Sequence, residues 1–255
     1  MGPPRHRRLG LFPQDDRLGP AWGDGRDPRD ARRAGAGGGE GLSPLIVGLA
    51  VGGAIFGALA DRLAVRWPEH DEEHPAGRAV GWRTVATAAI GAFAFAVLGL
   101  RFGAAELPVQ VLFGAWFACL VAGFAIDLDQ RLLPDELTIP VVPLALLLDV
   151  TGHNPLVGGS LLGALLVAAI VPIGLYLLSI PFGAGAFGIG DVKLLVGVGL
   201  MTGLTRTVAG LLAGLLAAGL VLAALLATRR IGRRTYVPFG PFLIFGALWS
   251  IFVNG

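Results

Sequence analysis

Two aspartates far apart in the sequence stand at the edges of long apolar runs, where a carboxylate is expensive and usually functional. Asp127 ends one run, close to a predicted helix C-terminus, where the helix dipole favours cations over acids. Asp191 begins another run, close to a predicted helix N-terminus, where the dipole stabilises a carboxylate. The unfavourable place of Asp127 is a reason to expect that it has a function.

A pair of aspartates can hydrolyse a peptide bond if the fold brings them together. Two neighbouring carboxylates cannot both ionise easily, so one serves as a base and the other as an acid near neutral pH. The base activates water, and the acid protonates or polarises the scissile carbonyl. This chemistry needs neither a metal, nor another cofactor, nor a nucleophilic Ser or Cys. We therefore predict Asp127 and Asp191 as a catalytic pair without a metal or cofactor.

The other acids near these motifs allow a plainer interpretation. Asp129, Asp135 and Glu136 are equally well explained as polar flanks of a helical hairpin, paired with Arg131. Asp191 taken alone could be a helix cap, which is a common role for Asp. Two aspartates at the edges of apolar runs indicate a functional site more strongly than either aspartate does alone.

A glycine-rich stretch and a stretch with two prolines accompany the acids. The glycine-rich stretch 182–190 lets the backbone bend sharply and approach another segment closely. It is not a nucleotide site, because no Gly-Lys-Ser/Thr sequence and no preceding βαβ unit accompany it. The stretch 236–242 has two prolines around an aromatic-glycine pair, which impose a bend before the last apolar run. It is either a turn at the membrane surface or a wall of a substrate groove.

The composition predicts a membrane protein. Hydrophobic residues make up 54% of the chain and charged residues 15%, against roughly 25% charged in soluble domains. We expect an all-α, polytopic membrane helix bundle in the lipid bilayer. The formal charge is +2, with the basic residues in connections, which gives no indication of nucleic-acid binding. About eight transmembrane segments are expected, at 43–61, 84–100, 107–126, 136–150, 155–180, 192–204, 206–227 and 239–253.

The basic residues predict an orientation. If the first apolar segment runs inward, ten Lys and Arg residues fall in inside connections and only two in outside ones. Cytoplasmic loops carry the excess of Lys and Arg in membrane proteins. Both aspartates then face the cytoplasm, and we expect a multi-pass protein of the bacterial inner membrane.

Residues 1–43 differ from the rest of the chain. They are rich in Arg, Gly and Pro, and we expect a disordered tail or a mis-assigned start. The remaining 44–253 form the predicted membrane domain, in which 62–83 is a cytoplasmic loop. His70 and His74 in that loop could ligate a metal, although a solvated, charge-mixed loop is the simpler interpretation.

Four stretches resemble the type IV prepilin peptidases, which are membrane aspartyl proteases. The resemblance implies that Asp127 and Asp191 are catalytic. Five further residues of the two aspartate motifs are expected to support them, namely Pro134, Asp135, Gly188, Gly190 and Lys193. The matching stretches are 127–138, 188–195, 237–242 and, more weakly, 53–63.

The resemblance implies an endopeptidase that cuts the short leader of prepilin-like or pseudopilin precursors after a glycine. The hydrophobic helix of the substrate would lie in the membrane beside the site. Many bacterial members also methylate the new N-terminus and carry paired Cys-x-x-Cys motifs in the first loop. Residues 62–83 contain no cysteine, so the zinc-stabilised form of that loop is not expected, and methyltransferase activity has no support in the sequence.

Two other classes of function compete with proteolysis. A small proton- or cation-coupled transporter could use the same two aspartates, because acids and glycine-broken helices are typical of such proteins. It would predict inverted repeats, and no convincing repeat relates the halves of the chain. A structural subunit of a pilus or secretion machine would leave the aspartate pair unexplained.

Overall fold

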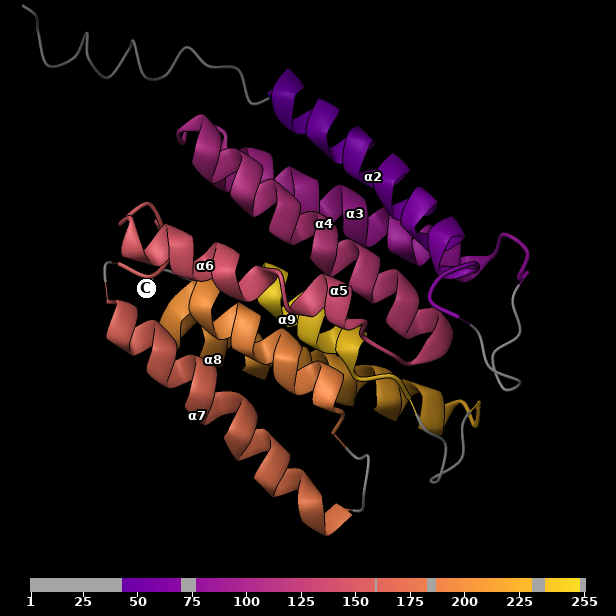
Figure 1. The fold of residues 1–255 in the computed structure, drawn as a ribbon. Coiled ribbons are helices and arrows are strands. Elements are labelled where there is room, and N and C mark those ends of the chain that lie inside the picture. The colour runs from indigo at the N-terminus through magenta and orange to yellow at the C-terminus, as the bar shows by residue number, and fades with distance from the viewer. Residues whose placement is uncertain (1–42, 70–76, 159, 183–186, 231–236, 253–255) are drawn as a thin grey trace, which may run out of the picture. The chain divides into compact units, whose positions relative to one another are not determined.

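A computed structural model gives the architecture. It describes residues 43–69, 77–158, 160–182, 187–230 and 237–252. The predicted tail therefore lies outside the described residues except for Ser43, and so do His70 and His74. Within the described part of the chain every regular element is helical, as Figure 1 shows. The expected all-α class is confirmed.

The helices pack side by side, and their bounds follow the apolar runs of the sequence. In chain order they are α2 (Pro44–Ala64), α3 (Trp82–Phe102), α4 (Leu107–Gln130), α5 (Asp135–Thr138), α6 (Val141–Val150), α7 (Leu161–Ser179), the short 3₁₀ helix η1 (Ile180–Phe182), α8 (Ile189–Ala227) and α9 (Gly240–Ser250).

Among the described residues, five helices are long and apolar enough to cross a membrane, namely α2, α3, α4, α7 and α8. The protein is therefore a polytopic membrane helix bundle, but the expected number of about eight spans is not confirmed. The segment 136–150 forms the one-turn α5 and the 10-residue α6, and the last segment forms the 11-residue α9. Spanning the bilayer takes about 20 residues, so these helices are too short to cross it alone.

Gly203 divides α8 into two limbs. The element has 39 residues, and a straight helix of that length would be about 58 Å long, nearly twice the hydrocarbon thickness. At Gly203 φ is 72° and ψ is −178°, a conformation that glycine adopts without steric cost. Figure 1 shows the chain turning back there. The predicted segments 192–204 and 206–227 thus correspond to two limbs that run in opposite directions.

Glycine allows several helices to touch backbone to backbone. A Cβ atom added at Gly57 of α2 would collide with the carbonyl oxygen of Thr87 in α3. At the other end of the chain, a Cβ at Gly214 of α8 would lie 2.5 Å from the carbonyl oxygen of Phe242 in α9. Small residues drive such close packing in lipid, where no hydrophobic effect holds helices together.

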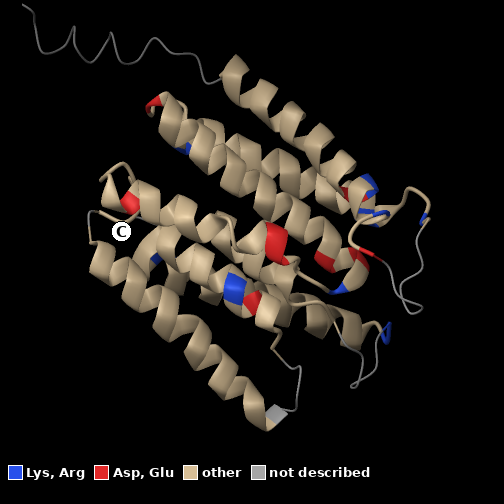
Figure 2. Cartoon of the chain, viewed as in Figure 1, with Lys and Arg blue, Asp and Glu red and all other residues tan. Residues whose placement is uncertain are grey.

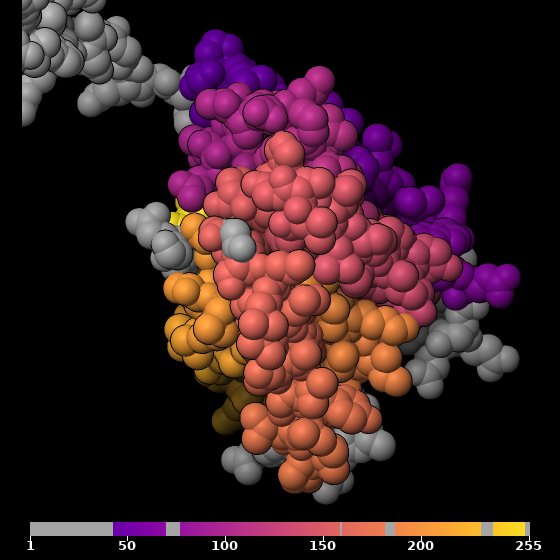
Figure 3. Space-filling model, turned by 60° about the vertical axis from the view of Figure 1, so that its left-hand side comes forward, coloured from indigo at the N-terminus to yellow at the C-terminus, as the bar shows by residue number. Residues whose placement is uncertain are grey.

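The core is centred on α4. Phe113, Trp116 and Phe117 of this helix are almost fully buried, and Phe102 of α3 stacks on Phe113 with ring centroids 4.1 Å apart. The space-filling view shows α7 packed over α8 (Figure 3). Charged residues lie mostly near the ends of the helices, as Figure 2 shows. This arrangement leaves apolar surface toward lipid and gathers the polar groups where the aspartate motifs lie.

Candidate active site

Asp127 lies in the last turn of α4 and points into the protein. Its exposed fraction is 5%. The helix ends because Arg131 adopts a left-handed conformation with φ of 57°, and its N–H donates to the carbonyl oxygen of Asp127 over 3.0 Å. Among the described residues, Oδ2 of Asp127 has no hydrogen-bond partner. A buried oxygen without a partner is costly for stability, so the arrangement points to a use other than structural support.

The backbone of α9 forms one wall beside Asp127. α9 begins at Gly240, and a Cβ atom placed there would lie 2.8 Å from Oδ2 of Asp127 and 2.9 Å from its Cγ. Only a residue without a side chain can come so close to the carboxyl group. The positive end of the α9 dipole therefore faces this carboxyl group.

Asp191 is the third residue of α8. Its Oδ2 accepts a hydrogen bond from the N–H of Gly188, at 3.2 Å, which is the arrangement of a capping box. The side chain is half-buried. The neighbouring Gly190 packs against Leu133 and Gly240 packs against Asp127, so the fold places the two aspartate motifs and the start of α9 at one junction. The capping role of Asp191 is also present and does not exclude the predicted catalytic role.

The remaining residues of the two motifs join α4, α5 and α8. A Cβ atom at Gly190 would lie 3.0 Å from the Cβ of Leu133, so glycine permits the start of α8 to touch the segment after α4. The Nζ of Lys193 donates to Oδ1 of Asp135 over 2.6 Å, in an exposed pair. Pro134 is buried and precedes the first residue of α5.

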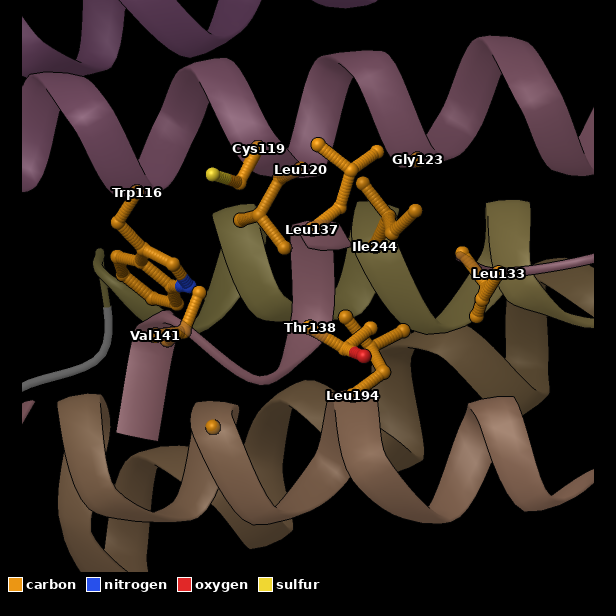
Figure 4. Close-up of a pocket in the computed structure, with 11 residues that line it drawn as sticks. Trp116, Cys119, Leu120, Gly123, Leu133, Leu137, Thr138, Val141, Leu194 and Ile244 are labelled. Carbon is orange, nitrogen blue, oxygen red and sulfur yellow. The ribbon is translucent and has the colours of Figure 1, made fainter. Parts of the chain in front are cut away.

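The interior beside this junction is apolar. Figure 4 shows Leu133, Leu194 and Ile244 converging between α4, α8 and α9 on a small cavity. The rings of Phe187 and Phe239 meet edge to face with centroids 6.1 Å apart. All three stretches that the sequence analysis singles out therefore meet at one place. Gly240, whose role the sequence leaves open, is the residue that brings the third stretch into contact with Asp127.

A cluster of charges lies behind Asp127, and the sequence analysis does not predict it. We call Arg78 and Arg83 with Asp61 and Asp129 the arginine brace. Burial disfavours the charge of Arg78, but hydrogen bonds to Asp61 and Asp129 outweigh it and hold the pKa of Arg78 above its ordinary value. The sequence contains one signal for this cluster, which is an acid, Asp61, inside an apolar run.

An apolar groove of about 610 Å³ is lined by Leu128, the residue that follows Asp127. It runs between α3, the end of α4, the second limb of α8 and α9, with Leu128 and Pro241 at the end near Asp127. Aromatic side chains form much of its wall, namely Trp82, Phe93, Phe242, Phe245 and Trp249. In the described part of the chain, no group of three or more His, Cys, Asp and Glu residues is placed to hold a metal ion.

Comparison with known proteins shows a similarity to one family. Residues 112–228 match the model of the type IV leader peptidase family, and they include both Asp127 and Asp191. Through these residues, the chain is similar to the type IV leader peptidase family. The resemblance inferred from the motifs is confirmed at this level.

Similar curated members of this family are prepilin leader peptidase/N-methyltransferases. The protein of Pectobacterium carotovorum subsp. carotovorum is 29% identical over 168 residues, which are 61% of this chain and 57% of that protein. The protein of Aeromonas hydrophila is 32% identical over 124 residues, 49% of this chain and 43% of that protein. The Burkholderia pseudomallei protein is 32% identical over 146 residues, 53% and 44% of the two chains. This chain thus spans about half the length of the curated relatives it matches, and no solved structure matches it.

Proposed function

We propose that this chain is a membrane aspartic endopeptidase of the type IV leader peptidase family, with Asp127 and Asp191 as its catalytic pair. The observation that carries the proposal is that the distant motifs pack together, with Gly190 of α8 against Leu133 and Gly240 of α9 against Asp127, whose Oδ2 is buried without a hydrogen-bond partner. The family match covers both motifs.

The surroundings of the two carboxyl groups favour different roles. Asp191 accepts a hydrogen bond from Gly188 at a helix N-terminus, which stabilises its charge, so Asp191 acts as the base. Asp127 is more deeply buried and acts as the acid. Asp191 takes a proton from water as the oxygen attacks the peptide carbonyl, and Asp127 gives its proton to the carbonyl oxygen. The tetrahedral intermediate then collapses as Asp127 regains its proton and Asp191 passes the first one to the leaving amine.

The substrate we propose is a prepilin or pseudopilin precursor, cut after the glycine that ends its short basic leader. The relatives are named as prepilin leader peptidases. The bias of Lys and Arg toward one side supports a site facing the cytoplasm, in the bacterial inner membrane. The apolar groove supports the same substrate, because Leu128, the residue after Asp127, lines it and its apolar walls suit the hydrophobic helix that follows the leader.

The test uses the purified protein in mixed micelles with a purified precursor that has a basic leader ending in glycine and a hydrophobic helix. We expect the wild type to release the leader, with mass spectrometry placing the cut after glycine. D127N and D191N should each lower kcat by at least about 10³-fold, because the proposed reaction needs both carboxyl groups together. The exposed Glu136, changed to Gln, is the matched control.

Cleavage that persists in D127N and D191N would overturn the assignment of the pair. A wild type that never cleaves the precursor, but whose proteoliposomes pass protons or cations in a manner that depends on both aspartates, would instead identify a transporter.

A further inference from the structure

The last turn of α4 needs external support if it is to hold Asp127 in one place. The final carbonyl groups of a helix have no partners within the helix, and helix ends fray. Asp127 and Asp129 both lie in this turn, where the helix dipole disfavours acids. The last turn of α4 is therefore not well stabilised by its own interactions, although it carries a carboxyl group of the proposed pair.

The arginine brace holds this turn from the side opposite to Asp127. Residues two apart on a helix point to different faces, so Asp129 faces away from the site when Asp127 faces into it. Oδ1 of Asp129 accepts hydrogen bonds from Nε of Arg78 at 2.9 Å and from Nη1 of Arg83 at 2.7 Å. The side chain of Asp129 is 8% exposed, so these ion pairs are largely shielded from water.

Arg78 connects α4 to α2 as well. Its Nη2 donates to Oδ1 of Asp61 at 2.6 Å, and Asp61 is fully buried. Oδ2 of Asp61 accepts a hydrogen bond from Thr84 of α3 at 2.6 Å. A single guanidinium group therefore bridges two carboxylates from different helices, which the planar fork of Arg can do and the point charge of Lys cannot.

A second contact joins the last turn of α4 to the end of α2 and the connection that follows it. Nε2 of Gln130 donates to the carbonyl oxygen of Ala64 at 3.2 Å and to that of Pro68 at 3.3 Å. Both residues that follow Leu128 in α4 are thus fastened to the end of α2 and the connection after it. These bonds leave the turn little freedom to shift relative to α2 and α3.

We propose that Arg78 is a positioning residue for the reaction, which fixes the carboxyl group of Asp127 relative to Asp191 through Asp129. This inference rests on the proposed function. The bonds of Arg78 go to Asp129 and Asp61, and in this proposal it acts by holding the helix turn that carries Asp127.

The kinetic test compares R78A and R78K with the wild type on the same precursor. Both variants should lower kcat, R78A by about tenfold to a hundredfold, as expected for a displacement on the order of 1 Å at a reacting group. KM should change by less than about twofold, because substrate binding is untouched. R101A is the matched control, because Arg101 is an exposed arginine at the other end of α3.

Hydrogen exchange provides a readout that does not depend on proteolysis. Exchange at the backbone amides of 127–131 should accelerate in R78A and R78K, while amides in the middle of α4 keep their wild-type rates. In the double variant R78A/D129N, the loss of kcat should be less than the product of the two single losses, because both changes remove the same contact.

If R78A keeps the wild-type kcat, or raises KM alone, the positioning role of Arg78 is wrong. Cleavage by the wild type in the same experiment would still support the proposed function. Unchanged exchange at 127–131 in R78K, which keeps the charge and is the milder change, would overturn the positioning role as well. If the wild type does not cleave any precursor, the proposed function fails first, and the exchange experiment alone decides whether Arg78 braces the turn.

Discussion

Gly240 can lie against the carboxyl group of Asp127 because glycine has no Cβ atom. A methyl group on Gly240 would stand within 3 Å of the carboxyl group, which is closer than real Cβ atoms come to their neighbours. The carboxyl group would have to rotate or α9 would have to withdraw. In either case the geometry between Asp127 and Asp191 would change, although no chemical group of the site would be lost.

We therefore predict that G240A lowers kcat by about tenfold or more, as expected for a small misplacement of a reacting group. Leader cleavage by the purified variant measures the effect. G48A is the control, because a Cβ at Gly48 of α2 meets no atom within 4 Å. Equal activity of G240A and wild type would show that the carboxyl group does not need this wall.

The sequence predicts much of the site at this scale and little of its surroundings. Asp127 and Asp191 are identifiable because each lies where an apolar run stops or starts, which is a local signal. The partners of Asp129 are not identifiable, because the predicted first loop and its edges hold several arginines and only the fold decides that Arg78 and Arg83 reach it.

Among the elements, α9 packs mainly against α8. Gly210 and Gly214 are one helical turn apart on α8 and face Gly246 and Phe242 of α9. A Cβ at Gly214 would lie 2.5 Å from the carbonyl oxygen of Phe242. The same contact that packs α9 against α8 also sets where the start of α9, at Gly240, meets Asp127.

We predict that G214V separates α9 from α8, destabilises the protein by about 1–3 kcal/mol through overpacking, and lowers the rate of cleavage. Thermal unfolding in detergent measures the first effect and leader release the second. G219V on the same limb of α8 should change neither, because Gly219 faces open space. Wild-type stability in G214V would mean that the two backbones are not in contact.

The lengths of the elements were less predictable than their existence. The run 136–150 is largely apolar, yet Pro140 lacks the N–H group that a continuous helix needs, and α5 and α6 form instead. The reversal at Gly203 has a local signal in the glycine, but many glycines in this chain lie within unbroken helices. Whether a glycine turns the chain or packs against a neighbour depends on the partner it meets.

At the scale of the whole molecule, charge and apolar surface are distributed unevenly. The arginine brace, both aspartates and the Lys193–Asp135 pair belong to the part of the chain's fold where α2 and α4 finish and α3, α5 and α8 begin. Glu106 lies at the other end of α4 and is exposed. The apolar groove begins at the charged end.

The proposed orientation can be tested with single cysteines in a C119A background. A membrane-impermeant thiol reagent should label E106C and leave E69C unlabelled when it is added to cells whose outer membrane or cell wall has been removed and whose inner membrane is intact. Permeabilised cells should show labelling at both positions, which are exposed. The reverse pattern would place the aspartates outside the cytoplasm.

The groove has its own test. A217F adds a ring to its wall, and we expect KM for the precursor to rise by about tenfold while kcat stays close to wild type, because binding rather than chemistry is obstructed. L220F is the matched control, since Leu220 is exposed on the same limb of α8. An unaltered KM in A217F would mean that the hydrophobic helix of the substrate lies elsewhere.

The position of Gly240 in the chain also determines when the site can form during synthesis. α9 is the last described helix to leave the ribosome, after both aspartates have been made and α2 and α3 have had time to associate. Until α9 arrives, Asp127 lacks the wall against which its carboxyl group lies. A nascent chain that holds both aspartates in the membrane thus still lacks part of the proposed site, and neighbouring membrane proteins are not exposed to the finished site before α9 is in place.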